Sequence, residues 1–149
     1  MSMPSAVSVC LWYDGNAEEA ARFYSSLLPN SEITNISPVM VTFTLDGVPF
    51  QALNGGPQFK PTEAASIVIS TRTQEETDSL WSALVADGGS EGRCAWLKDR
   101  FGVSWQIVPQ ILPKLLGASD RQAADRALQA MLKMTKIDIK ALEAAFNAW

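Results

Sequence analysis

The sequence predicts an α+β fold made of two copies of a βαβββ unit, followed by a helical extension. Three observations support this prediction. Patterns typical of strands and amphipathic helices recur in the same order over residues 5–54 and 64–109. Two short motifs match between these stretches at nearly the same shift. Residues 110–149 carry helical patterns without a strand signal. We therefore expect a paired βαβββ domain over residues 1–109 and a helical extension over 110–149.

In the first unit, an apolar run over residues 7–13 predicts a strand that ends at the turn pair Asp14-Gly15. Asn16 and Glu19 form a capping-box pattern, which predicts the start of a helix. Pro29 should end that helix because proline lacks the backbone N–H. Three strand-like segments follow, with Asp46-Gly47 as a hairpin signal between the last two: residues 31–37, 39–45 and 48–53.

The second unit repeats this order. Residues 65–71 predict a strand, and Thr73 with Glu76 repeats the capping box. Gly88-Gly89 should end the second helix. Two further strands are expected, over residues 94–97 and 103–109.

The two matches between the units are specific. A shift of 57 residues places Asn16 on Thr73 and Glu19 on Glu76. A shift of 55 places Gly47-Val48-Pro49-Phe50-Gln51 on Gly102-Val103-Ser104-Trp105-Gln106. One unit alone leaves a sheet face and two edges uncovered, so pairing two units would supply a core.

The extension contains two further helix starts. Ser119 with Gln122 forms a capping-box pattern, and Asp138 is expected to cap the last helix. These helices could cover the outside of the domain or dock on a second copy of the chain. We favour packing within a dimer.

Composition limits the function classes. A chain of 149 residues can form one domain with a sizeable core. The net charge of −4 provides no basic field for nucleic acid or an anionic membrane. The apolar runs are too short to cross a bilayer, and the first residues lack a signal-peptide pattern. The spacing of Cys10 and Cys94 is not that of a metal site. We expect a cytoplasmic protein whose partners are a small molecule and its own second copy.

The motifs resemble those of the vicinal-oxygen-chelate superfamily, which includes glyoxalase I, extradiol dioxygenases and bleomycin-resistance proteins. Within it, the chain is most similar to the PhnB-like branch. The aromatic pair Phe23-Tyr24 and four segments carry the resemblance: residues 11–20, 52–60, 96–106 and 131–138. The resemblance implies a homodimer in which curled mixed sheets surround a pocket.

Active members of that superfamily usually hold a divalent metal on the first and fourth strands of each unit. The resemblance places Val9, Gln51, Ser66 and Gln106 at those positions. Valine cannot ligate, and neutral amides and a hydroxyl do not offset the lost hydration of a divalent cation. The chain also contains no histidine. We therefore expect no metal and no other cofactor.

Period-two alternation suggests which strand residues face the pocket. It places Gln51 and Leu53 on one face, and Phe50 and Trp105 on the helix side. On the first strand, the same alternation predicts that Val9, Leu11 and Tyr13 face inward and that Cys10 is buried under a helix. The candidate pocket residues are Gln51, Gln106, Ser66, Tyr13, Leu53, Ser104 and Val9. The alternative is that both glutamines lie at exposed edges or inside a filled core.

These residues favour a metal-free small-molecule-binding protein. One alternative is a metal-free enzyme that stabilises an enolate or oxyanion with amide and hydroxyl groups. Asp14, Lys98 and Asp99 could serve as its base if loops cover the pocket, and no catalytic residue is identified. Another is a purely structural dimer with a filled cavity. A 3-demethylubiquinone 3-methyltransferase activity, a label sometimes attached to this branch, is disfavoured because the first strand lacks a following Gly-rich loop.

Overall fold

The computed structural model describes residues 5–148, and the chain divides into two compact units between Pro61 and Thr62. The first unit contains β1 (Val9–Tyr13), α1 (Ala17–Leu27), β2 (Glu32–Ile36), β3 (Met40–Leu45) and β4 (Val48–Asn54). The second contains β5 (Ser66–Thr71), α2 (Gln74–Val85), the 3₁₀ turn η1 (Ala86–Gly88), β6 (Ser90–Glu91), β7 (Trp96–Lys98) and β8 (Ser104–Pro109). The extension forms α3 (Ile111–Leu116), α4 (Arg121–Met131) and α5 (Ile139–Phe146).

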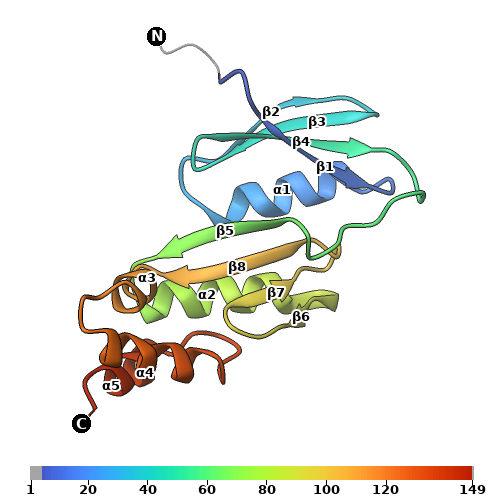
Figure 1. Ribbon diagram of the computed structural model, residues 1–149. Helices are drawn as coiled ribbons and strands as arrows, with labels where there is room; N and C mark the ends of the chain where they lie inside the picture. Colours follow the sequence, from blue (N-terminus) through green and yellow to red (C-terminus); the bar gives the residue numbers. More distant parts are fainter. Residues whose placement is uncertain (1–4, 149) are drawn as a thin grey trace. The chain divides into compact units, whose positions relative to one another are not determined.

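Each unit is a four-stranded mixed sheet with one helix packed on it (Figure 1). The strand orders are β1-β4-β3-β2 and β5-β8-β7-β6, so the two units have the same topology. The pairs β1/β4 and β5/β8 are parallel, and the other neighbours are antiparallel. The predicted α+β class and the duplicated βαβββ unit are confirmed.

The core of each unit lies between its sheet and its helix. In the first unit, Phe43 and Phe50 stack with ring centroids 5.4 Å apart beneath Tyr24 of α1. In the second, Trp105 and Ile107 are completely buried. Alternate residues of β3 are buried, as expected for a strand with one face on a helix.

The helix starts and turns follow the sequence prediction in part. Thr73 and Asp138 cap α2 and α5 through their side chains, and Asp46 and Gly47 both have positive φ, as a type I′ hairpin turn requires. The helix starts after Asn16 as predicted, but the expected side-chain cap was wrong, because the Asn16 side chain makes no cap hydrogen bond. Asn54, at the end of β4, instead accepts a 2.9 Å hydrogen bond from the Ala17 N–H.

Two other local predictions were also wrong. Asp120, rather than Ser119, caps α4, with its carboxylate accepting from the Ala123 N–H. Strand β6 was missed because it has only two residues. A Cβ on the nearby Gly92 would lie 2.8 Å from the Trp96 carbonyl oxygen, so the chain beside β7 requires glycine at that position.

The extension packs on the second unit of the same chain. Its apolar contacts form a cluster that includes Ala95, Leu112, Ala127, Ile137 and Leu142. Backbone hydrogen bonds reinforce it, since the N–H groups of Cys94 and Ala95 donate to Met134 and Thr135. Docking of these helices on a partner chain stays a prediction. No helix within residues 5–148 has the length and apolar character needed to cross a membrane.

Candidate functional site

The face of each sheet opposite its helix, here called the open face, carries most of the expected pocket residues. In the first unit, β4 places Gln51 and Leu53 there, because the alternate residues Phe50 and Ala52 are buried. In the second, the register aligns Ser66 with Ser104, and Gln106 lies two residues further along β8 on the same face.

The predicted orientation of β1 was wrong. Parallel pairing aligns Val9 with Phe50 and Tyr13 with Asn54, so Val9 and Tyr13 lie on the helix side of the sheet. Tyr13 is 3% exposed, and its hydroxyl donates to the Tyr24 hydroxyl of α1 at 3.0 Å. Neither residue therefore faces the open side, where the sequence analysis had placed them.

The strand register explains the error. Cys10 pairs with Gln51, and Val68 pairs with Gln106. Because the two glutamines are equivalent, Cys10 corresponds to Val68, and the residue equivalent to Ser66 is Ser8. The expected burial of Cys10 beneath a helix was also wrong, since Cys10 is exposed. Partial desolvation raises the pKa of its thiol, which favours the protonated form.

A loop of the first unit covers part of its own open face. The Trp12 indole N–H donates to the Gly56 carbonyl at 2.8 Å, and the Phe59 ring meets Trp12 edge-on at 4.9 Å. A Cβ on Gly55 would lie 2.3 Å from the Trp12 ring. Trp12 lies beside Leu53 on the open side, under residues 55–59.

In the second unit, three of the predicted residues lie together. The Gln106 side-chain amide donates to the Ser66 hydroxyl at 2.9 Å. Ser104 is 1% exposed, and its hydroxyl has no hydrogen-bond partner within residues 5–148. A buried hydroxyl without a partner loses hydration without compensation, which makes Ser104 a candidate hydrogen-bond donor for a ligand.

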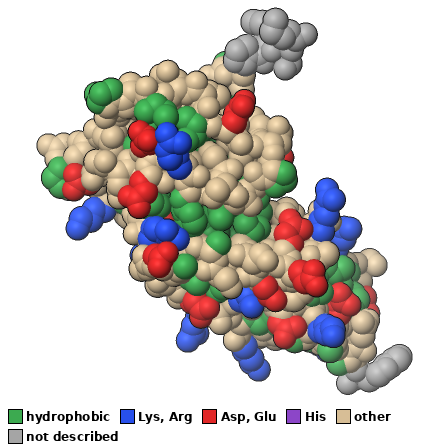
Figure 2. All heavy atoms as spheres, turned by 180° about the vertical axis from the view of Figure 1, so that it is seen from behind, with side chains coloured by type: hydrophobic (Ala, Val, Ile, Leu, Met, Phe, Trp, Pro, Cys, Tyr) green, Lys and Arg blue, Asp and Glu red, His purple; other side chains and the backbone are tan. Residues whose placement is uncertain are grey.

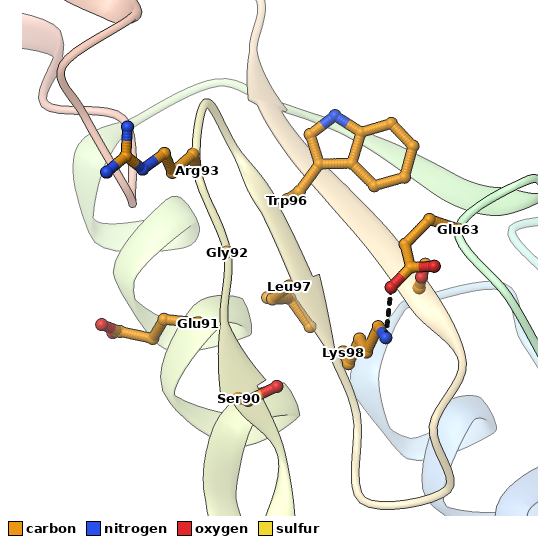
Figure 3. A pocket seen from close by; sticks show the side chains of 9 residues that line it. Glu63, Ser90, Glu91, Gly92, Arg93, Trp96, Leu97 and Lys98 are labelled. Carbon is orange, nitrogen blue, oxygen red and sulfur yellow. Dashed lines mark ion pairs between the residues drawn. The ribbon is translucent and has the colours of Figure 1, made fainter.

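Ser104 lines a pocket of about 400 Å³ beside β6 and β7 (Figure 3). Other residues that line it include Glu63, Ser90, Arg93, Trp96 and Lys98. Lys98 and Glu63 form an ion pair. The hydrogen bond from Lys98, followed by the backbone N–H of Glu63 and the Lys98 charge, lowers the pKa of the Glu63 carboxyl.

Asp99, one of the candidate bases, has a structural role. Its Oδ1 accepts from the N–H groups of Phe101 and Val103 at 2.8 and 3.0 Å. Its Oδ2 accepts from the Trp105 indole N–H at 2.8 Å. These bonds hold the turn between β7 and β8 and orient the strand that carries Ser104 and Gln106.

The described residues do not fit a divalent metal. Within residues 5–148, no three His, Cys, Asp or Glu side chains come together as ligands. The open faces offer the amides of Gln51 and Gln106 and the hydroxyl of Ser66, which are weak neutral donors.

Sequence reasoning missed part of the pocket. Glu63 precedes the second unit's first strand and carries no motif. For Trp96 and Lys98, the available signal was their alternation on β7, which places both side chains on one face. Whether Gln51 and Gln106 line one common cavity stays a prediction.

The exposed charges give no sign of a nucleic-acid surface on the side drawn in Figure 2. Lys and Arg side chains there are interspersed with Asp and Glu. This mixture agrees with the net charge of −4 over the whole sequence.

Comparisons with known proteins place this geometry in a family. The family model described as 3-demethylubiquinone-9 3-methyltransferase matches residues 5–108. A search of curated proteins gave no match. The solved structure of a PhnB protein from Bacillus cereus is 31% identical, with a TM-score of 0.65, and the match covers 70% of this chain and 99% of that one.

Two more distant structures show the same fold. A glyoxalase/bleomycin resistance protein from Albidiferax ferrireducens is 18% identical, with a TM-score of 0.52, over 71% of this chain and 99% of that one. The fosfomycin resistance protein FosX from Listeria monocytogenes is 14% identical, with a TM-score of 0.52, and the match covers 72% of this chain and 91% of that one. The chain therefore belongs to the family described as 3-demethylubiquinone-9 3-methyltransferase, the PhnB-like branch of the glyoxalase-type vicinal-oxygen-chelate superfamily.

Proposed function

We propose that this chain binds a small molecule, as proteins of the glyoxalase/bleomycin-resistance type do, and that the pocket beside β6 and β7 forms part of its site. The Ser104 hydroxyl carries the proposal, because it is buried in the pocket wall and has no hydrogen-bond partner among residues 5–148. Trp96 adds an aromatic surface and Lys98 a charge, a combination of apolar wall and few polar groups that is typical of ligand sites.

A thermal-shift screen of a broad compound library tests this proposal. A ligand that binds the folded protein raises Tm, and Ser104→Ala should reduce the shift for compounds that use this pocket. The matched control is Ser70→Ala, a serine on β5 outside the pocket lining. A screen without a stabilising compound would contradict the proposal, as would shifts that Ser104→Ala leaves unchanged.

We also propose that binding does not use a metal. The sequence has no histidine, and within residues 5–148 no three His, Cys, Asp or Glu side chains come together as ligands. Elemental analysis of protein purified without chelators should find less than about 0.1 transition-metal ion per chain. A tightly held ion near one per chain would contradict this.

Methyl transfer, which the family description names, is a less favoured function. A methyl donor such as S-adenosylmethionine binds doubly wound proteins where neighbouring parallel strands end at a helix N-terminus. Each sheet here has one parallel pair, at its edge, and the loop after β1 is the short turn Asp14-Gly15-Asn16. A calorimetric titration with S-adenosylmethionine should give no binding heat, and micromolar affinity would favour the methyltransferase.

A metal-free enzyme is the second candidate. Ser104 and the amide of Gln106 lie on the same face of β8 and could donate hydrogen bonds to an oxyanion or enolate. For an activity found by substrate screening, Ser104→Ala should lower kcat more than about tenfold. An unchanged kcat would remove the hydroxyl from the reaction.

We infer a homodimer as well, as the family resemblance implies, and a cytoplasmic location. Sedimentation equilibrium should give twice the chain mass of 16.2 kDa. A mass of one chain at micromolar concentration would contradict the dimer.

A further inference from the structure

The geometry of the second unit points to a ligand with a carboxylate next to an apolar or aromatic group, and to Glu63 as a built-in competitor that occupies Lys98 until the ligand displaces it. This inference rests on the proposed function of the same pocket. It specifies the charge of the ligand and identifies the Lys98–Glu63 ion pair as the contact that must break when the ligand binds.

The two halves of the ion pair are held very differently. Lys98 belongs to β7, where its backbone lies between Ser90 of β6 and Ser104 of β8. Glu63 lies outside the strands, in a short turn where the Ala65 N–H donates to the Thr62 carbonyl. The cation is therefore on a strand paired on both sides, whereas the carboxylate is on a turn outside the sheet.

Opening the pair costs little. The Lys98 and Glu63 side chains are 44% and 62% exposed, and ion pairs at such exposure contribute little net stability. A free ligand that presents a carboxylate to Lys98 and also contacts the pocket wall gains more interaction free energy than the Glu63 side chain does. Figure 3 shows the Glu63 carboxylate beside the Lys98 ammonium, with Trp96 on the same strand as Lys98.

Ser104 independently indicates an acceptor group at this position. Lys98 and Ser104 are direct neighbours in the antiparallel register, so their side chains lie on one face. The buried Ser104 hydroxyl has a proton to donate and no acceptor within residues 5–148. A carboxylate at Lys98 could accept from this hydroxyl as well, which the side chain of Glu63 does not do.

The remaining charges favour an anion over a cation. Glu91 accepts a hydrogen bond from the Trp81 indole N–H of α2 at 2.8 Å, and its side chain points away from Lys98 (Figure 3). When Glu63 leaves, Lys98 and Arg93 are the charged groups of the lining without a carboxylate partner among the contacts above. A carboxylate ligand would take the place of Glu63 at Lys98, whereas an ammonium ligand would have to compete with Lys98 for Glu63.

Three aromatic probes of one shape test the inference: 2-naphthoate, 2-naphthamide and 2-naphthylmethylammonium. Calorimetry should show that the carboxylate binds the wild-type chain at least about tenfold more tightly than the amide. Glu63→Gln should tighten naphthoate binding about threefold, because the competitor is lost. Lys98→Gln should remove the preference for the carboxylate, and the amide should bind both proteins equally.

Controls separate this inference from the proposed function. Glu75→Gln removes the same charge from the first turn of α2 and should leave naphthoate affinity unchanged. Unchanged Tm values for the variants show that these exposed side chains are not needed for folding. Equal binding of carboxylate and amide, or preference for the ammonium, would overturn the carboxylate inference and leave a neutral or cationic ligand for the pocket. Absence of binding by all three probes would overturn the carboxylate inference, whereas the proposed function would be contradicted only if the broad thermal-shift screen also found no ligand.

Discussion

The two units have the same strand order but differ in the strand at their edge. Strand β2 has five residues and pairs along most of β3, whereas β6 has two residues beside β7. The equivalent open-face positions are Thr42 and Thr44 in the first unit and Trp96 and Lys98 in the second, by their pairing with β4 and β8.

This difference determines what those positions do. The Thr42 hydroxyl hydrogen bonds to the Thr34 hydroxyl at 2.8 Å, and the Thr44 hydroxyl accepts from the Glu32 N–H at 3.2 Å. The longer β2 therefore satisfies both threonines. In the second unit the edge is shorter, and Trp96 and Lys98 line a pocket instead. Duplicated units can thus diverge in function through the length of one edge strand.

The largest predicted effect concerns the extension, which the first unit lacks. Leu142 is completely buried in the cluster between the extension and the second unit. Leu142→Ala should lower the free energy of unfolding by about 3 kcal/mol, because it leaves a cavity. Hydrogen exchange should accelerate in β7, β8 and the extension more than in β1–β4. Leu132→Ala, at a position 46% exposed on the same extension, is the control and should have little effect.

The next effect tests why β6 is short. Gly92→Ala would place a Cβ 2.8 Å from the Trp96 carbonyl oxygen. We expect a loss of about 2 kcal/mol in the free energy of unfolding, because backbone must shift. Ser90→Ala on β6 itself should change stability by less than about 0.5 kcal/mol. If chemical denaturation finds the two variants equally stable, the close approach at Gly92 does not limit the length of β6.

The two units also start their helices differently. Thr73 caps α2 locally, whereas Asn54 serves α1 from the end of β4. Asn54→Ala and Thr73→Ala should each cost about 1 kcal/mol, while Asn16→Ala should cost less than about 0.5 kcal/mol. A larger loss for Asn16→Ala than for Asn54→Ala in urea unfolding would contradict this assignment.

The smallest effect concerns a surface contact between α2 and the loop before α5. The Asp78 carboxylate accepts from Lys136 at 2.8 Å and from Gln74 at 2.9 Å, and these hydrogen bonds, that from Lys136 first, lower the pKa of Asp78. A carboxyl with a lowered folded-state pKa stabilises the fold above its unfolded pKa of about 3.9, and this contribution is lost as pH falls through the folded pKa. Because both partners are partly exposed, Asp78→Asn should cost about 0.5 kcal/mol at pH 7.

Urea unfolding at several pH values checks this sign. The difference between wild type and Asp78→Asn should shrink below about pH 4. A difference that grows as the pH falls would contradict the role assigned to the Asp78 carboxylate.

The sequence predicted the parts of the fold that depend on local patterns. The repeated order of strands and helix, the Thr73 cap and the Asp46-Gly47 turn all follow from neighbouring residues. The face of β1 was misassigned because Cys10, Leu11 and Trp12 make both sides of that strand apolar, so alternation gives no direction. The Asn54 cap and the Glu63 ion pair join residues far apart in the chain, and no local pattern reports such contacts.

A titration of the ¹⁵N-labelled protein with 2-naphthoate, followed by NMR, tests the central claim most directly. We predict saturable chemical-shift changes for the backbone amides of Trp96, Lys98 and Ser104 and for the Trp96 indole. The changes should be smaller at the equivalent positions of the first unit, Thr42 and Thr44 on β3 and Phe50 on β4. Shifts confined to the first unit, or none at β7 and β8, would contradict a ligand site beside the short edge strand.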